Sequence, residues 1–246
     1  MSPISDFSSA PASVPPAHRG LCEVFLKIGG SILDHDAVTA ALVPTITSLA
    51  PQYRIIVLTG GGQAAKRVKA NQVKLGGDFY DFWKATGLFP EVNAYLLASY
   101  SNAFTIVKCA AEIQACFASG RVAIFAPAGA ILSSLYFLPD WLVTTDSMGL
   151  HFAKQAGARR YVVVSDVDGI FPKAPAKDGR GAPFQRMTVD DLEQLSSSKL
   201  DPGFSHYYRR FPLPTFIVNG HHPDRVDAAI RGAPTLGTEI VVTRDE

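Results

Sequence analysis

Apolar runs of strand length alternate with segments of helical spacing along most of the chain. Runs rich in β-branched and aromatic residues predict buried strands at about 22–28, 54–59, 121–126, 161–165, 215–218 and 238–243. Apolar residues at helical spacing and capping residues predict helices at about 36–50, 91–103, 107–119 and 223–230, and from about 63, 146 and 188. Strands that alternate with helices predict an α/β fold with a mainly parallel sheet, whose ligands bind at the carboxyl ends of the strands.

The amino-acid composition is typical of a globular domain and does not indicate a nucleic acid or a membrane as partner. Hydrophobic residues make up 47% of 246 residues, and the formal net charge of +1 gives no reason to expect nucleic acid or a membrane as partner. Residues 1–20 are rich in Ser, Pro and Ala and predict a disordered tail, which leaves 21–246 as a single domain. Three cysteines without a C-x-x-C pair, and no signal-peptide pattern, favour a reducing, cytoplasmic location.

The strand predicted at 22–28 ends in a glycine turn. Lys27 interrupts its apolar run, and Gly29, Gly30 and Ser31 follow. Glycines let the backbone approach a ligand closely, and the N–H groups of such a turn can bind an anion that a nearby lysine also reaches. The stretch therefore predicts a phosphate site, or else a plain strand and turn whose lysine extends into solvent.

The same order of a predicted strand, a glycine turn and a predicted helix recurs at Gly60, Gly61 and Gly62. Polar residues also follow other strands, among them Asp166 and Asp168. Asp146 comes at a predicted helix start, where it can cap the helix, hold a catalytic cation, or do both. Glycine loops, a lysine and several carboxylates are the groups that phosphoryl transfer needs.

Several other site types lack support. The sequence has no P-loop motif, no complete G-x-G-x-x-G, no zinc spacing and no G-x-S-x-G elbow. Asp166-x-Asp168-Gly169 lacks the remaining ligands of a calcium loop. The aromatic residues between 79 and 89 fit an ordinary helix core best, with a pocket wall or a subunit contact as alternatives.

Four motifs in order resemble the amino-acid kinase superfamily: Leu26–Ser31, Gly60–Gly62, Thr145–Ser147 and Ser165–Ile170. The closing segment 216–226 is similar to the (aminomethyl)furanyl-methyl phosphate kinases of methanofuran biosynthesis, which use ATP to convert a phosphate monoester into a diphosphate. The chain also resembles uridylate kinases and molybdenum storage protein subunits. The resemblance implies a three-layer α/β/α sandwich with a mainly parallel central sheet.

The resemblance also implies roles for individual residues. Lys27 and Asp146 would be catalytic, with Lys27 stabilising the transferred phosphoryl group and Asp146 orienting Lys27. The acceptor side would be formed by Gly60, Gly61, Gly62 and Thr145. The nucleotide side would be formed by Gly29, Gly30, Ser31, Ser165, Asp166, Asp168, Gly169, Phe171 and Lys173.

The implied function is an ATP- and Mg²⁺-dependent small-molecule kinase whose acceptor is a phosphate monoester or a carboxylate, in a homo-oligomer such as a dimer or hexamer. No metal-ligating residue is assigned. One departure is a missing Gly-Gly-Met-x-x-Lys-like segment between 195 and 212, for whose lysine Lys173, Lys177 or Arg180 are candidate substitutes. The alternative function is a non-catalytic nucleotide- or oxyanion-binding storage or regulatory subunit.

Overall fold

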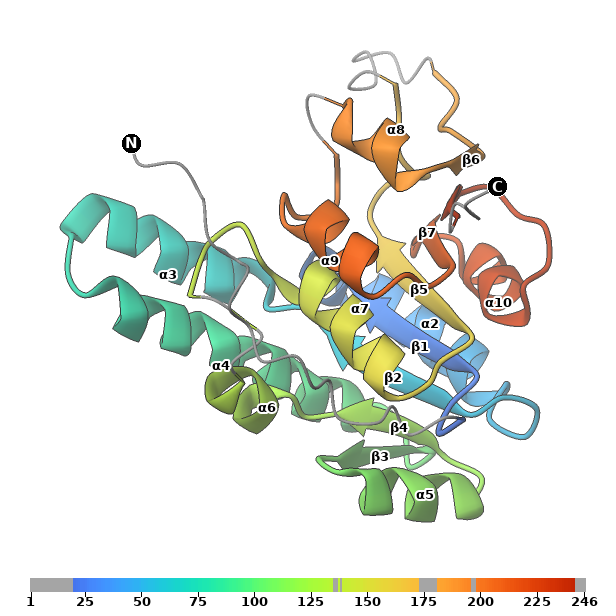
Figure 1. The fold of residues 1–246 in the computed structure, drawn as a ribbon. Coiled ribbons are helices and arrows are strands. Elements are labelled where there is room, and N and C mark those ends of the chain that lie inside the picture. The colour runs from blue at the N-terminus through green and yellow to red at the C-terminus, as the bar shows by residue number, and fades with distance from the viewer. Residues whose placement is uncertain (1–19, 135–136, 138, 173–180, 196–197, 242–246) are drawn as a thin grey trace.

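The protein folds around one eight-stranded sheet in a computed structural model that describes residues 20–134, 137, 139–172, 181–195 and 198–241 (Figure 1). The strand order is β3-β4-β2-β1-β5-β7-β8-β6, and all neighbours are parallel except β7 and β8. The strands are β1 Val24–Ile28, β2 Ile55–Thr59, β3 Phe104–Val107, β4 Val122–Phe125, β5 Arg160–Ser165, β6 Arg186–Met187, β7 Thr215–Asn219 and β8 Thr238–Ile240.

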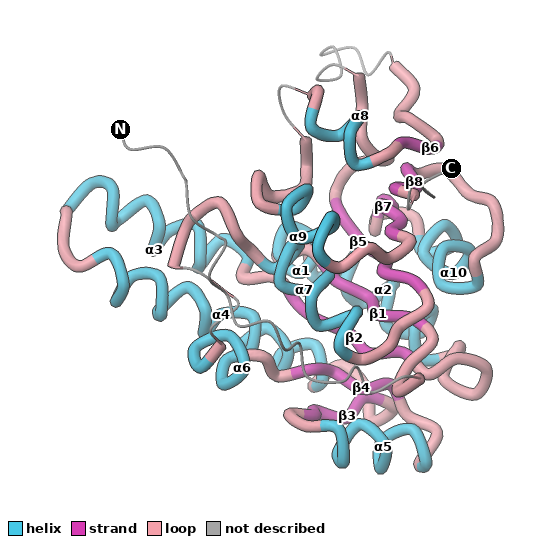
Figure 2. The backbone as a smooth tube through the Cα atoms, viewed as in Figure 1, coloured by secondary structure: helices cyan, strands magenta, loops and turns pink. Residues whose placement is uncertain are grey.

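Helices cover both faces of this sheet, which confirms the three-layer α/β/α fold (Figure 2). Side chains alternate along β1, so that Phe25 belongs to the core cluster under α7 and α9, whereas Leu26 belongs to the cluster under α2 and α10. The helices are α1 Gly30–Leu33, α2 Asp36–Thr47, α3 Gly62–Leu75, α4 Phe79–Ala98, α5 Ala110–Ala118, α6 Ala128–Ser133, α7 Thr145–Gln155, α8 Val189–Glu193, α9 Phe204–Arg210 and α10 Pro223–Arg231.

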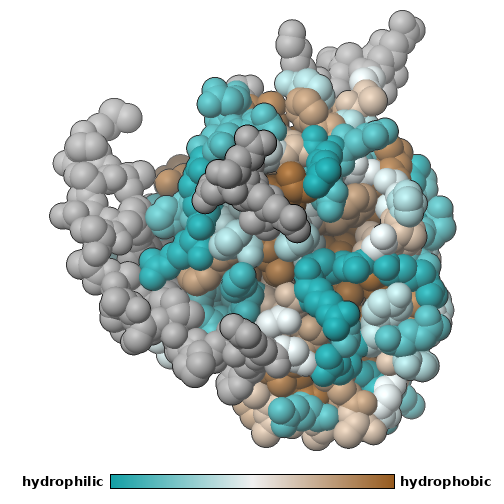
Figure 3. All heavy atoms as spheres, turned by 45° about the vertical axis from the view of Figure 1, so that its right-hand side comes forward, coloured by the Kyte–Doolittle hydropathy of each residue, from teal (hydrophilic) through white to brown (hydrophobic). Residues whose placement is uncertain are grey.

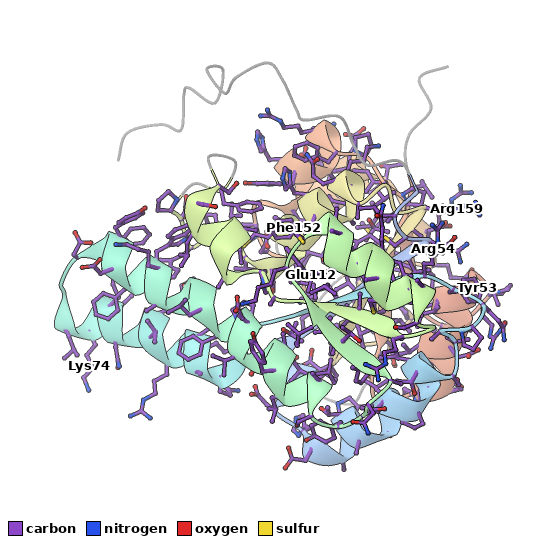
Figure 4. The ribbon with its side chains drawn as sticks, turned by 90° about the horizontal axis from the view of Figure 1, so that it is seen from below. Tyr53, Arg54, Lys74, Glu112, Phe152 and Arg159 are labelled. Atoms are coloured by element: carbon purple, nitrogen blue, oxygen red, sulfur yellow. The ribbon has the colours of Figure 1, made fainter. Side chains whose placement is uncertain are left out.

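The strand order places a ligand-binding edge at the centre of the sheet. From β1 the chain continues to β2 on one side, and β5 pairs with β1 on the other, so β1 lies at a topological switch point. The carboxyl ends of β2, β1 and β5 meet there. Arg54 and Arg159 precede β2 and β5 and lie together at the opposite, amino end of the sheet, far from the end of α3 marked by Lys74 (Figure 4).

Several elements differ from the sequence-based expectation. The helix expected at 91–103 is the second half of α4, which begins at Phe79 and passes through Gly87 and Pro90 without ending. Packing overrides these two helix breakers: a Cβ at Gly87 would lie only 3.4 Å from Ile131 of α6, and the Thr59 hydroxyl donates to the Pro90 carbonyl at 2.5 Å. The short strands β3 and β6, helix α6 and the seven-residue helix α9 were not expected.

The predicted tail falls almost entirely on residues 1–19, outside the described part of the chain, so both the disordered tail and the single domain at 21–246 stay predictions. None of the helices in the described ranges is both long enough and apolar enough to cross a membrane.

Candidate functional site

Two glycine turns, one after β1 and one after β2, pack directly against each other. A Cβ atom at Gly30 would lie 2.1 Å from the backbone nitrogen of Gly62, and one at Gly60 would lie 2.6 Å from the nitrogen of Gly30. Gly62 also has a positive φ of 63°. The close approach therefore requires glycine at these positions, and it brings the two predicted phosphate-binding turns into one site.

Side chains from other elements hold the second turn. The Asn93 side-chain amide on α4 donates to the Gly60 carbonyl at 2.6 Å, and the Gln63 backbone N–H donates to Asp34 at 3.2 Å. Asp34 thus caps α3 from a different segment of the chain, since no cap comes from Gly61 itself. Both contacts hold the second glycine turn from segments outside it.

Unpaired backbone N–H groups gather at this edge. Within the described ranges, no acceptor is found for the N–H groups of Gly30 and Ser31, nor for those of Thr145 and Asp146 in the first turn of α7. Helix starts and glycine turns with free N–H groups bind anions. Such an arrangement can receive negatively charged oxygen atoms.

Lys27 and Asp146 form the charged centre of the site. The Lys27 ammonium lies 2.6 Å from Asp146 Oδ1, and each side chain is only 10% exposed. The contact is an ion pair without hydrogen-bond alignment, because Asp146 Oδ1 has no hydrogen-bond partner among the described residues. A Cβ at Gly29 would lie 3.7 Å from the Lys27 nitrogen, so the ammonium reaches the first glycine turn.

A second buried carboxylate, Asp201, holds the start of α7. Its Oδ2 accepts from the Thr144 N–H at 2.9 Å, the Thr144 hydroxyl at 2.8 Å and the Ser147 N–H at 3.0 Å, and its Oδ1 accepts from the Ser147 hydroxyl. Asp201 therefore caps the N-terminus of α7 from a loop that is distant in sequence. The N-cap residue Thr144 makes no side-chain cap of its own. Burial, followed by the charge of Asp146, raises the pKa of Asp201 to about 6.

The carboxylates after β5 are paired with cations. Lys199 lies 3.1 Å from Asp166, and Arg225 on α10 lies 2.7 Å from Asp168. Burial would raise the pKa of Asp166, but the hydrogen bond and charge of Lys199 outweigh it and lower that pKa. The hydrogen bond from the Asn219 side chain, opposed by burial and helped by Arg225, lowers the pKa of Asp168. Both side chains are thus ionised at neutral pH.

A cavity of about 240 Å³ opens beside the second glycine turn, between α3, α4, α6 and the start of α7. Its wall is mainly apolar, and its two tryptophans are each held by another ring: Phe79 meets Trp141 edge-on at 5.2 Å, and Tyr80 stacks on Trp83 at 5.8 Å. The lining residues are Gly61, Ala65, Lys66, Lys69, Trp83, Thr86, Gly87, Pro90, Ile131, Trp141, Val143, Thr144, Thr145 and Met148.

The structure brings most of the predicted site residues to one edge of the sheet. Ser165, Gly169 and half-buried Phe171 continue from β5 beside Asp166 and Asp168, whereas Lys173, Lys177 and Arg180 lie outside the described residues. The described ranges contain no cluster of three or more His, Cys, Asp or Glu side chains that could hold a metal. Of the aromatic residues between 79 and 89, Trp83 lines the cavity, as one sequence alternative had it.

Sequence reasoning missed Asp201, Lys199, Asn93 and Arg225. Each acts on the site from a segment more than 30 residues from its partner, so no local pattern marks it. Arg225 is the partial exception, because it lies in the closing segment 216–226 that carries the family resemblance, although the sequence assigned it no role in the site.

Comparison with known proteins agrees with this geometry. Residues 23–219 match the model of the amino acid kinase family. The chain is 29% identical over 224 residues to [5-(aminomethyl)furan-3-yl]methyl phosphate kinase of Methanocaldococcus jannaschii, covering 88% of this chain and 96% of that protein. It is 27% identical over 228 residues to a uridylate kinase of Methanococcoides burtonii, covering 82% and 88%.

Among solved structures, the fold is similar to that of uridylate kinase from Archaeoglobus fulgidus, with a TM-score of 0.70 at 22% identity over 89% of this chain and 100% of the other. UMP kinase from Bacillus anthracis gives a TM-score of 0.70 at 16% identity over 89% and 95%. The family match spans most of the chain and contains both glycine turns, Lys27 and Asp146, so the chain belongs to the amino acid kinase family and is a small-molecule phosphotransferase.

Proposed function

We propose that the protein transfers the γ-phosphoryl group of ATP to a phosphate monoester or carboxylate acceptor. The observation that carries the proposal is the ion pair of Lys27 and Asp146 at the junction of the two glycine turns. Of the two acceptor classes, the phosphate monoester has the better support, because the relatives are named for a furan-methyl phosphate and for uridylate, which are both phosphate monoesters.

In this proposal the first turn holds ATP and the second holds the acceptor. The free N–H groups of Gly30 and Ser31 bind ATP phosphates, and those at the start of α7, beside Thr145, bind the acceptor's anionic group. Lys27 stabilises the negative charge on the phosphoryl group in transit between the turns, and Asp146 keeps the ammonium in place. The remaining nucleotide-side residues that the structure describes, Ser165, Asp166, Asp168, Gly169 and Phe171, would border the nucleotide. Lys173 lies outside the described residues and stays a prediction.

Magnesium fits this arrangement through the nucleotide. Mg²⁺ in kinase sites takes oxygen ligands from substrate phosphates, water and one or two carboxylates rather than from a cage of protein side chains. Asp166 and Asp168 are ionised carboxylates at the nucleotide side, and their present partners Lys199 and Arg225 are cations that ATP phosphates can also attract. Asp166, Asp168 and the ATP phosphates would hold the ion, which would supply positive charge against the negative charge of the phosphates.

Lys199 is a candidate to replace the phosphate-binding lysine of the motif that is missing between residues 195 and 212. It comes from the loop between α8 and α9 and reaches Asp166, one strand away from the first glycine turn. A lysine acts on phosphate as a flexible point charge, so its exact position in the sequence is less constrained than that of a bidentate arginine. We propose that it takes the place of the absent lysine, and that the protein is catalytic rather than a storage or regulatory subunit.

We also propose that the protein acts in the cytoplasm as a homo-oligomer. The exposed face of α4 supports the second part: Leu88, Val92, Tyr95 and Leu96 are between 47% and 58% exposed and follow helical spacing.

The proposed reaction is tested at Lys27. The expected effect of Lys27→Ala is a loss of roughly 10²–10³ fold in kcat, the scale for removing one preorganised electrostatic donor. ATP affinity, measured by thermal shift, should fall less, because backbone N–H groups still hold the phosphates. Asp146→Asn should lower kcat in the same direction.

The measurement is ADP release with and without a panel of phosphate monoesters and carboxylates, with the mass of each product. Equal turnover by parent and Lys27→Ala would refute the catalytic role of Lys27. A parent protein that binds ATP but turns over no acceptor would favour the storage or regulatory alternative.

A further inference from the structure

We propose that the acceptor is the phosphate ester of a compact apolar alcohol, such as an aryl methanol, that carries neither a sugar nor a cationic group. The inference rests on the proposed kinase function and specifies its acceptor. The relatives named above are named for a nucleotide and for an aminomethyl-substituted furan phosphate, so the acceptor proposed here differs from both.

The chemistry of the cavity wall changes from polar to apolar. Gly61, Thr144 and Thr145 belong to the second glycine turn and the start of α7, where free N–H groups suit the phosphate. Trp83 and Trp141 contribute two aromatic side chains to the rest of the wall. An aromatic ring gains both burial and offset or edge-on stacking against such side chains.

A nucleoside finds few partners in this wall. Uracil and ribose present several donors and acceptors that need hydrogen bonds when buried. The Thr86 hydroxyl already donates to the Trp83 carbonyl at 2.7 Å, and the Thr144 hydroxyl already donates to Asp201 at 2.8 Å. No Asn, Gln, Asp or Glu is found among the lining residues that the structure describes.

The Trp141 indole N–H indicates that the acceptor carries a hydrogen-bond acceptor atom near this side chain. The Trp141 indole nitrogen is buried and has no hydrogen-bond partner among the described residues. A buried N–H without a partner is costly, so a ligand that supplies an acceptor atom is favoured. A phosphate-ester oxygen or a ring oxygen would meet this need without any polar group elsewhere on the acceptor.

A cationic acceptor is disfavoured by charge. Lys66 and Lys69 lie three residues apart on α3 and line the cavity, and no ion pair with a carboxylate is found for either among the described residues. The Lys69 ammonium lies 5.4 Å from the centre of the Trp141 ring. An ammonium group on the acceptor would meet these like charges with no carboxylate in the described wall to offset them.

Intrinsic tryptophan fluorescence tests this inference without ATP. The chain has two tryptophans, and both line the cavity, so saturable quenching reports on this pocket. Benzyl phosphate, 4-(aminomethyl)benzyl phosphate and UMP are the three probes. We expect benzyl phosphate to bind at least about tenfold more tightly than either of the others, the discrimination that one unmet polar or charged group gives.

A charge reversal sharpens the test. Lys69→Glu should reverse the preference between the two benzyl phosphates, because it places a carboxylate beside the ring. Lys74→Glu is the matched control: Lys74 lies in the last turn of the same helix, outside the cavity, and points away from it (Figure 4). It should leave the order of affinities as in the parent.

The outcomes separate the inference from the kinase proposal. Quenching by benzyl phosphate without ADP release would support the inference and count against the proposed reaction. Tighter binding of UMP than of benzyl phosphate, or the same order of affinities in Lys69→Glu as in the parent, would overturn the inference even if ADP is released.

Discussion

Asp201 places a second negative charge beside Asp146 in the interior of the protein. Burial and the charge of Asp146 disfavour its ionised form, whereas the hydrogen bonds from Ser147 and Thr144 favour it, and its pKa is raised to about 6. An unfolded aspartate titrates near pH 3.9. The folded protein therefore keeps a proton on Asp201 over a pH range in which the unfolded chain has lost it.

The sign of this difference gives a prediction for Asp201→Asn. Between about pH 4 and pH 6 the unfolded state binds fewer protons at this position, so the free energy of unfolding of the parent should fall as pH rises, by up to about 1.4 kcal/mol for each unit. Above about pH 6 the contribution should be constant. The asparagine variant lacks the titration, so the parent-minus-variant difference, from urea denaturation at several pH values, should show this slope.

Asp190→Asn serves as the control, because Asp190 is 64% exposed and pairs with Arg209 at the surface. Its pH dependence of unfolding should run parallel to that of the parent. A parent-minus-variant difference for Asp201→Asn that is independent of pH between about 4 and 6 would contradict the raised pKa.

Candidate site residues could be named from the sequence where the signal is local. Lys27 stands next to its glycine turn and Asp146 stands at a helix start, so each could be named from neighbouring residues. Asp201 contacts Thr144 and Ser147 from 57 and 54 residues away, and Lys199 contacts Asp166 from 33. Only the fold brings these pairs together.

The contact between the two glycine turns is the element-scale feature on which the site depends. Gly30 begins α1 and Gly62 begins α3, and their backbones approach too closely for a side chain at Gly30. Gly30→Ala forces one turn to move, which should cost about 1–3 kcal/mol, the usual range for overpacking. The melting temperature should fall by about 2–4 °C per kcal/mol, and stabilisation by ATP should be reduced.

Gly129→Ala is the matched control, because a Cβ at this position in α6 would meet nothing within 4 Å. Alanine is the better helix former, so the melting temperature should be unchanged or slightly higher. Differential scanning fluorimetry with and without ATP measures both variants. Equal melting temperatures and equal ATP shifts for the two would show that the glycine contact is not needed.

Elements with a strong internal pattern could be predicted, and those shaped by packing could not. The capping box of Thr188 and Asp191 at α8 and the proline at the start of α10 are both present in the structure. The four-residue edge strand β3 carries too short a pattern to identify, and α4 continues through Pro90 because its neighbours hold it.

At the scale of the whole molecule, the surface is uneven in its hydrophobic content. The side brought forward in Figure 3 intersperses hydrophilic and hydrophobic residues. By contrast, half of the large exposed hydrophobic residues of the described chain lie on α4, which runs from the left-hand side toward the middle of the molecule in Figure 1. The sequence predicted a homo-oligomer only through the family resemblance, because exposure on a helix is set by what packs against it.

The last prediction concerns this face of α4, formed by Leu88, Val92, Tyr95 and Leu96. A stable dimer buries about 1,600 Å² in total, and an apolar helix face that pairs with its own copy supplies the centre of such an interface. In Val92→Glu/Leu96→Glu, two charges would be buried without partners on each side, so the oligomer should dissociate into monomers in light scattering coupled to size-exclusion chromatography.

Leu236→Glu is the control for added charge, since Leu236 is 41% exposed and lies in the loop before β8. It should keep the oligomeric mass of the parent.

The proposed interface does not overlap the cavity. The cavity is lined from α4 by Trp83, Thr86, Gly87 and Pro90, whereas the proposed interface is a different face of the same helix. Loss of the oligomer should therefore leave tryptophan quenching by benzyl phosphate within about threefold, a difference of less than 1 kcal/mol. A monomeric parent, or a double variant with the parent's mass, would refute the interface.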